Sequence, residues 1–352
     1  MEPILPNVLQ KKFISLSKSA PTKVRTGKSF SVFKRTAYIS PLRLNIKNYE
    51  RHLLAAFNPG ATIANNKLHI FPRLVFGYNW YTSSIGHFTV NIEEAISKVK
   101  ATSFSTEIIK YPTETWEHGA GSIGGCEDAR IANIGGKNMM AYTAVAKGKD
   151  GILPLQAYAT MDSKFQPKVL NYFKINHNGA NYITSSWKDS AFLDTNSANV
   201  LTRPAFKYGS TTAEVCWSAK MDFDTGEIPS ESFEPLLRAE EFEEKVGWST
   251  NAVKLGNKDF LVGYHGVGSD FVYRNGIAVV NSEGKLLGAT DYLLSPSKSI
   301  EEYYGDVPHV MFGCGLVRYK EYLIWVGGLS DYAIGIYAAK SEDIIEKIKW
   351  IN

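Results

Sequence analysis

The strongest constraint on the fold is a strand-like run that recurs about every 60 residues along the chain. Each run is short, largely apolar, and enters a small polar turn. The runs end at Asn91, Asp162, Asp222, Ser282 and Asp343, so that successive ends lie 71, 60, 60 and 61 residues apart. A period of this length with several short strands per unit is typical of sheets repeated around an axis. Five such units predict an all-β fold, a five-bladed β-propeller.

Two segments at the ends of the chain fall outside this pattern. Residues 1–45 precede the region where strand signals dominate, and we predict that they form an N-terminal extension. The propeller, which would carry the functional site, is then expected over residues 46–352. Near the C-terminus, Ile344, Ile345, Ile348 and Ile351 have helical spacing, which predicts a short amphipathic helix over residues 341–352.

The charged residues are scattered, except for a basic cluster in the N-terminal extension. The chain has a net charge of +4, and the cluster comprises Lys11, Lys12, Lys18, Lys23, Arg25, Lys28, Lys34 and Arg35. A basic tail can contact nucleic acid or anionic lipid. Because no nucleic-acid motif accompanies this one, we expect a solvated extension or an oligomer contact, and no nucleic-acid partner.

The sequence also argues against a membrane protein and against a metal centre. Nowhere do about 18 apolar residues occur together, and a signal-peptide pattern is missing, so we expect no membrane partner and a cytoplasmic location. Cys126, Cys216 and Cys314 are odd in number and far apart, which indicates buried thiols. Since Asp, Glu and His residues form no close cluster, neither a metal nor a cofactor is expected.

The most informative stretch is GSIGGCEDARIANIGG (121–136), where Glu127, Asp128 and Arg130 lie between a glycine-rich turn and a strand. Glycines at 121, 124 and 125 remove side chains beside the acids, which would let a ligand approach Asp128 closely. A turn aspartate with a surface pair between Glu127 and Arg130 explains this segment equally well. Other segments are needed to decide between the two interpretations.

Further charged and polar residues occur at strand positions where they are unusual. Arg73 lies in an apolar strand, where an arginine is expected to be enclosed and paired. The innermost strands of a propeller converge on a central funnel, so a site can gather residues from distant parts of the sequence. The remaining candidates are Asn58, Lys188, Arg203, Tyr264, His265 and Asp331.

The order of these motifs resembles that of glycoside hydrolase family 130, the mannoside phosphorylases and related mannosidases. The resemblance extends from residue 57 to about residue 339. It implies a five-bladed propeller, in agreement with the repeat. The matching segments are Asn58-Pro59 with Arg73 fifteen residues after Asn58, Glu127-Asp128-Ala129-Arg130, Lys188-Asp189, Thr202-Arg203-Pro204, Lys245-Val246-Gly247, Tyr264 to Val267, Gly305-Asp306-Val307-Pro308, and Asp331.

Three departures from the family pattern affect the surroundings of the charged groups. Ala129 replaces a proline, Thr202 replaces a histidine, and Gly328-Leu329-Ser330 stands where Gly-Ala-Ala is usual. Asp128 and Arg203 themselves match the family. We therefore expect membership of the family, while the departures bear on linkage and acceptor preference.

The resemblance implies inverting phosphorolysis of β-mannosides, such as mannobiose, mannosyl-glucose or manno-oligosaccharides, to mannose 1-phosphate. Asp128 would be the catalytic acid, passing its proton through a sugar hydroxyl to the glycosidic oxygen. Asn58, Arg73 and Asp331 would bind the mannosyl unit. Inorganic phosphate would be the co-substrate, and because a dianion needs fixed cations, Lys188 and Arg203 would bind it together with Tyr264 and His265.

Two alternatives stay open on the sequence. One is a hydrolase of the same fold in which Glu243 or Glu244 activates water, and the other is a non-catalytic sugar-binding propeller. Trp187 and Trp248 are either core residues or stacking platforms for an acceptor sugar. The mannosidic linkage, the acceptor and the formation of a homo-oligomer are not decided by these residues.

Overall fold

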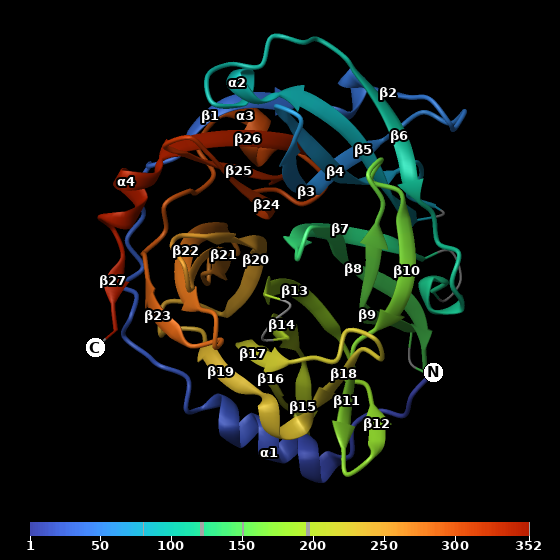
Figure 1. Ribbon diagram of the computed structural model, residues 1–352, viewed down its shortest axis with the longest axis vertical. Helices are drawn as coiled ribbons and strands as arrows, with labels where there is room; N and C mark the ends of the chain where they lie inside the picture. Colours follow the sequence, from blue (N-terminus) through green and yellow to red (C-terminus); the bar gives the residue numbers. More distant parts are fainter. Residues whose placement is uncertain (80, 120–122, 150, 195–197, 352) are drawn as a thin grey trace.

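The computed structural model describes residues 1–351 except 80, 120–122, 150 and 195–197. Antiparallel β-sheets dominate the described chain, and the helices are short and lie at its margin (Figure 1). This confirms the predicted all-β class. No helix within the described ranges combines the length and the apolar character needed to cross a membrane.

Five strands from distant parts of the sequence lie nearest the centre and contact one another in a ring (Figure 1). They are β3 (Ala55–Ala64), β7 (Gly124–Ile134), β13 (Trp187–Asp194), β20 (Lys245–Lys254) and β24 (Met311–Tyr319). Each continues outward through two antiparallel neighbours. The middle strands are β4 (Lys67–Val75), β8 (Lys137–Gly148), β14 (Asn199–Pro204), β21 (Asp259–Val267) and β25 (Tyr322–Leu329).

The runs that recur in the sequence are the third strands of these series. They are β5 (Thr82–Asn91), β9 (Gly151–Met161), β17 (Cys216–Lys220), β22 (Tyr273–Asn281) and β26 (Ala333–Lys340). Each third strand has an outer partner. The outer partners are β6 (Phe104–Lys110), β10 (Pro167–Tyr172), β19 (Glu234–Leu237), β23 (Leu286–Ala289) and β1 (Lys34–Ile39).

The strand β1 ties the N-terminal part of the chain to its last sheet. It pairs antiparallel with β26, from Lys34 opposite Ala338 to Ile39 opposite Ile334. Residues 34–39 of the predicted extension are thus an integral strand. The boundary near residue 45 stays a prediction. The strand β2 (Leu44–Ile46) crosses it and pairs in parallel with β6.

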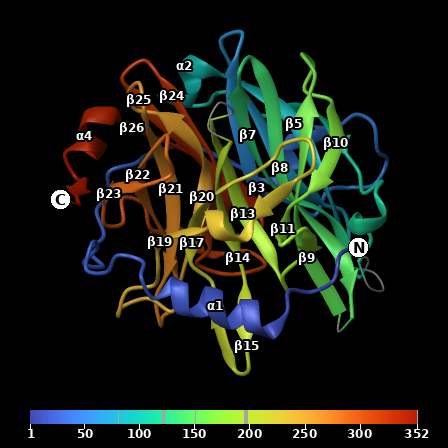
Figure 2. The same ribbon diagram turned by 60° about the horizontal axis from the view of Figure 1, so that its bottom comes forward.

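The helix α1 (Asn7–Ser17) packs on the sheets of its own chain, as Figure 2 shows. Phe13 is buried and stacks on Phe206 of β15 (Phe206–Tyr208), with ring centroids 4.2 Å apart. Leu9 is buried on the same side. The expectation of a solvated extension is wrong for this segment, because its apolar side chains stabilise the helix on the domain. The alternative of an oligomer contact stays a prediction.

The C-terminal helix is shorter than predicted. The helix α4 comprises only Ser341–Ile345, and β27 (Lys349–Trp350) then pairs with β23. Ile344 and Ile348 are buried, whereas Ile351 is exposed. Pairing with an open strand edge satisfies backbone groups that a frayed helix end would leave to water, so the helical pattern stops early.

The remaining elements are short. They are α2 (Ile92–Ala95), α3 (Ile300–Tyr303), β11 (Lys174–His177), β12 (Ala180–Tyr182), β16 (Thr211–Ala213), β18 (Glu227–Pro229) and the 3-10 turns Pro41–Arg43, Thr115–Glu117 and Ser230–Ser232.

The hydrophobic core lies between neighbouring sheets. One cluster joins Ile70 and Phe88 to Ile324 and Ile336, across β4, β5, β25 and β26. Trp187 and Trp248 are buried in two other clusters, which settles them as core residues rather than sugar platforms. The three cysteines are free and buried, as predicted.

Candidate active site

A bulge interrupts each of the five innermost strands. The register shifts lie between Phe57 and Gly60, Glu127 and Arg130, Lys188 and Ala191, Trp248 and Ala252, and Gly313 and Gly315. A bulge re-aims the side chains around it. Three of the bulges hold a polar residue in the left-handed region, Asn58 (φ 46°), Asp128 (φ 54°) and Asp189 (φ 58°), and Asn and Asp tolerate this conformation best among residues with a side chain.

These polar residues line a cavity of about 320 Å³. The sequence-predicted residues Asn58, Arg73, Asp128, Lys188, Arg203, His265 and Asp331 all lie in its wall. The other lining residues are Glu127, Asp189, Lys245, Tyr273, Val307, Val310 and Phe312. The fold therefore brings seven of the eight predicted residues together from distant parts of the sequence.

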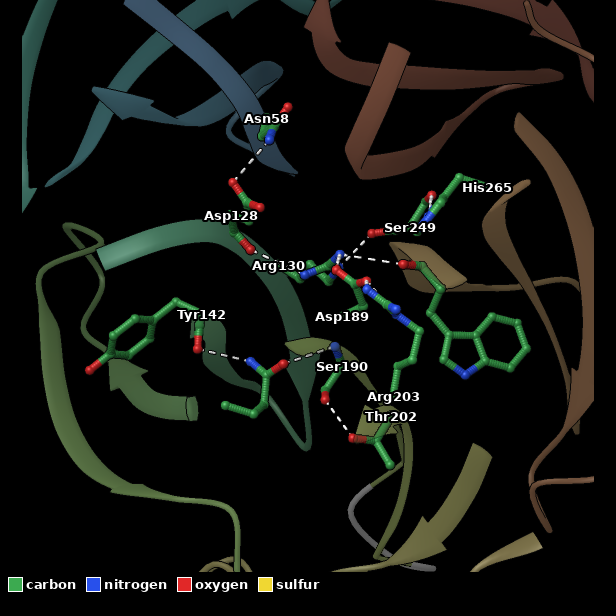
Figure 3. Close-up of polar contacts among 12 residues, drawn as sticks. Asn58, Asp128, Arg130, Tyr142, Asp189, Ser190, Thr202, Arg203, Ser249 and His265 are labelled. Atoms are coloured by element: carbon green, nitrogen blue, oxygen red, sulfur yellow. Dashed lines mark hydrogen bonds and ion pairs between the residues drawn. The ribbon is translucent and has the colours of Figure 1, made fainter. Parts of the chain in front are cut away.

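One side of the cavity is acidic and is organised by Arg73. Its Nη2 donates to Oε1 of Glu127 at 2.6 Å and to the hydroxyl of Tyr81 at 2.7 Å, and its Nη1 lies 3.6 Å from Oδ1 of Asp128. Asn58 donates a hydrogen bond of 3.1 Å to the same Oδ1 (Figure 3). Asp128 is thereby held in one orientation with its carboxylate at the cavity.

Two carboxyl groups on the acidic side have raised pKa values. Burial raises the pKa of Asp331 to about 7, and the charges of Asp128 and Asp306 act in the same direction, against that of Arg73. Burial also raises the pKa of Glu127, with Asp128 adding to the effect. Since several carboxyl groups share the single guanidinium of Arg73, at least one of them is easily protonated.

Arg130 does not form the predicted surface pair with Glu127. It is buried, and its Nη2 donates to Oδ1 of Asp189 at 3.0 Å, while its Nη1 donates to the backbone oxygen of Asp128 at 3.2 Å (Figure 3). The bulge after Glu127 turns the two side chains apart. Arg130 therefore connects the acidic side of the cavity to the opposite one.

The opposite side is cationic. Nε of Arg203 donates to Oδ2 of Asp189 at 2.7 Å, and Nη2 forms an ion pair with the same oxygen at 2.5 Å. Lys188 and Lys245 also line the cavity, and within the described residues neither has a carboxylate oxygen within 4.0 Å of its Nζ. Burial, followed by the charge of Arg203, lowers the pKa of Lys245.

His265 and Tyr264 face opposite sides of β21. His265 is buried in the cavity wall, with Nδ1 3.1 Å from the Ser249 hydroxyl and Nε2 without a partner among the described residues. Burial sets its pKa well below the usual range, so the ring is neutral. Tyr264 instead donates to the backbone oxygen of Thr290 at 2.7 Å. Its prediction as a phosphate ligand is wrong, because neighbouring strand residues alternate between faces.

Five charged or aromatic residues of the cavity wall were not predicted from the sequence: Glu127, Asp189, Lys245, Tyr273 and Phe312. Lys245 carried a signal, since it begins the Lys245-Val246-Gly247 segment. Asp189 carried one as well, next to Lys188. Tyr273 and Phe312 lie outside every motif, and their ring contacts with His265, at centroid distances of 5.5 and 5.0 Å, arise only in the folded chain.

The glycines before Asp128 serve the backbone rather than a ligand. A Cβ at Gly125 would lie 2.2 Å from the backbone oxygen of Ser83, and one at Gly124 would lie 2.7 Å from the nitrogen of Gly119. At Gly124 and Gly125 the backbone of Gly119 and Ser83 fills the space that a side chain would take, so these two glycines do not open a path for a ligand. Gly121 lies outside the described residues.

Two departures from the family pattern have a structural explanation. The Thr202 hydroxyl accepts from Trp187 Nε1 at 2.6 Å and lies 2.7 Å from the Ser190 hydroxyl, away from the cavity. In Gly328-Leu329-Ser330 the differing residues are Leu329, which is buried in a core cluster, and Ser330, whose hydroxyl donates to the backbone oxygen of Glu302 at 3.0 Å. Nothing in the structure explains why alanine replaces proline at 129.

The acids invoked for a hydrolase do not line the cavity. Glu243 is buried and paired with Arg25, and it accepts a hydrogen bond from the Tyr292 hydroxyl. Glu244 is exposed. In the part of the chain that the structure describes, no group of three or more His, Cys, Asp or Glu residues is placed to bind a metal ion.

The family model described as beta-1,4-mannooligosaccharide phosphorylase matches residues 23–350. The chain belongs to glycoside hydrolase family 130. This confirms the resemblance on which the site residues were chosen. No curated protein matches the sequence.

Solved structures share the fold of this glycoside hydrolase family 130 chain. The β-1,2-mannobiose phosphorylase from Listeria innocua, in complex with β-1,2-mannobiose, is 17% identical, with a TM-score of 0.68 over 90% of this chain and 98% of that one. A mannose phosphorylase from Leishmania mexicana, in complex with phosphate, is 15% identical, with a TM-score of 0.59 over 98% and 96%.

A third structure comes from a study stating that this family of mannoside phosphorylases contains hydrolases of β-1,2 mannosidic linkages in Candida mannan. It is 18% identical, with a TM-score of 0.61 over 92% and 97%. At these identities the likeness shows the fold alone.

Proposed function

We propose that the protein is an inverting β-mannoside phosphorylase that releases mannose 1-phosphate. The observation that carries the proposal is the division of charge within one cavity. Asp128, Glu127 and Asp331 lie around Arg73 on one side, and Lys188, Arg203 and Lys245 lie on the other. A hydrolase needs an acid and a base around a water, whereas a phosphorylase needs an acid and a cationic site for the attacking anion.

In this reaction a phosphate oxygen bonds to the anomeric carbon as the bond from that carbon to the glycosidic oxygen breaks. Asp128 supplies the proton that the leaving oxygen takes up, through a sugar hydroxyl as the family resemblance implies. Asn58, Arg73 and Asp331 bind mannosyl hydroxyls. Lys188, Arg203 and Lys245 neutralise the phosphate, and neutral His265 donates from Nε2 when Ser249 donates to Nδ1.

The proposal includes the architecture around this site. The ring of β3, β7, β13, β20 and β24, each leading into an antiparallel series, supports a five-bladed propeller with the cavity at one end of the ring. The substrates would be mannobiose, mannosyl-glucose or manno-oligosaccharides, together with phosphate. A cytoplasmic location suits a charged product that does not cross a membrane unaided.

The test is an incubation of the purified protein with β-1,2-, β-1,3- and β-1,4-mannobiose and mannosyl-glucose, with and without phosphate. Mannose 1-phosphate formed only with phosphate supports the proposal and identifies the linkage. Free mannose in both reactions would establish a hydrolase instead. Binding of a mannobiose without either product would favour a sugar-binding protein.

A further inference from the structure

Glu214 is an acidic residue next to the cationic side of the cavity. It belongs to none of the sequence motifs and has no role in the proposed reaction. It follows β16, and its carboxylate accepts a hydrogen bond from Nη1 of Arg203. The two groups differ in exposure, since the Glu214 side chain is 37% exposed and that of Arg203 is 1% exposed. The pair thus joins a buried guanidinium to a carboxylate that reaches water.

The position of Asp189 leaves one edge of the Arg203 guanidinium for a ligand. Asp189 occupies the edge formed by Nε and Nη2, at 2.7 and 2.5 Å. A phosphate that binds a guanidinium with two oxygens needs two N–H groups along one edge. The edge that remains is the one between Nη1 and Nη2, and Glu214 is bound at its Nη1 end.

Glu214 also acts on the rest of the cationic side. Its charge favours the charged form of Lys245, against the lowering of the Lys245 pKa by burial and by Arg203. Within the described residues Lys188 and Lys245 have no carboxylate within ion-pair distance. Among the described residues on this side, Arg203 is therefore the cation whose ligand-binding edge, between Nη1 and Nη2, already contacts a carboxylate of the protein, that of Glu214.

We propose that Glu214 competes with phosphate for Arg203 and so determines the affinity of the site for its anion. The inference rests on the proposed function. Phosphate displaces the Glu214 carboxylate, which moves into water, while Asp189 keeps Arg203 in place. Phosphate takes over the hydrogen bond from Nη1, and no covalent bond changes.

The N-terminal helix supports this arrangement. The hairpin of β15 and β16 leads directly to Glu214 and packs on α1. The backbone N–H of Lys207 donates to Oε1 of Gln10 at 2.6 Å, and Phe206 stacks on Phe13. The helix therefore helps to place the competing carboxylate, although it lies outside the cavity wall.

The experiment compares wild type, Glu214→Gln and the control Glu283→Gln by calorimetric titration with inorganic phosphate. Glu283 is exposed and pairs only with exposed Lys285 within the described residues. We expect phosphate to bind Glu214→Gln about three- to ten-fold more tightly than wild type, because a neutral amide competes less well for the guanidinium. The control should match wild type. In phosphorolysis assays, the KM for phosphate should fall while the KM for the mannoside stays the same.

Glu214→Asp provides a second variant if the amide disturbs folding. Its shorter side chain reaches Arg203 less well, so its phosphate affinity should lie between those of wild type and Glu214→Gln. Equal or weaker phosphate binding by Glu214→Gln, in protein that still phosphorolyses mannosides, overturns the inference and leaves the proposed function standing. Mannobiose binding without phosphate binding in all variants overturns both.

Discussion

Asn58 donates the hydrogen bond that orients Asp128, with Nδ2 3.1 Å from Oδ1. The two residues are 70 positions apart and occupy equivalent bulges of β3 and β7. Both have positive φ. The proposed acid is therefore positioned by β3 as well as by its own strand, β7.

Asp128→Asn should reduce phosphorolysis about 10²- to 10⁴-fold, because the amide cannot supply the proton to the leaving oxygen. Calorimetric binding of phosphate should change little, since the cations lie on the opposite side. Initial rates of mannose 1-phosphate release measure the effect, with exposed Asp343→Asn as the control. Near-normal rates in Asp128→Asn would exclude Asp128 as the acid.

Asp331 should make stability depend on pH. Its pKa is about 7 in the folded protein, against about 3.9 in an unfolded chain, so the native state binds the extra proton. The stabilisation is complete below about pH 4 and is lost as the pH rises through 7. Asp331→Asn should therefore raise the melting temperature more at pH 8 than at pH 5. An equal change at both pH values would contradict the raised pKa.

Gly247→Ala should weaken phosphate binding without unfolding the protein. The added Cβ would lie 2.4 Å from Cε1 of His265 and 2.8 Å from Nε of Arg203, so both side chains must move. We expect the KM for phosphate to rise on the order of ten- to a hundred-fold. Gly256→Ala is the matched control, since a Cβ there meets nothing within 4 Å. An unchanged KM would show that this part of the cavity does not bind phosphate.

Phe13→Ala should destabilise the protein by about 3–5 kcal/mol, because it removes a buried ring stacked on Phe206. Urea unfolding followed by fluorescence measures the loss. Val8→Ala on the exposed side of α1 should change the free energy of unfolding by less than about 0.5 kcal/mol. Similar small effects for both variants would mean that α1 is not part of the cooperative fold.

The sequence by itself determined the all-β class, the family and half of the residues that line the cavity. The recurring runs predicted the third strands because short apolar runs and the polar turns that follow them are local properties. The motifs predicted Asn58, Arg73, Asp128, Lys188, Arg203, His265 and Asp331 as site residues, and all of them line one cavity. Their chemical roles remain predictions for the experiments above.

Only the tertiary structure decided the partners of these groups. Tyr264 and His265 are adjacent, and which of them faces the cavity depends on strand register, where a shift of one residue exchanges the faces. Arg130 contacts Asp189, and β1 pairs with β26 near the other end of the chain. Such contacts depend on how sheets meet in space, and short-range sequence patterns carry no information about that.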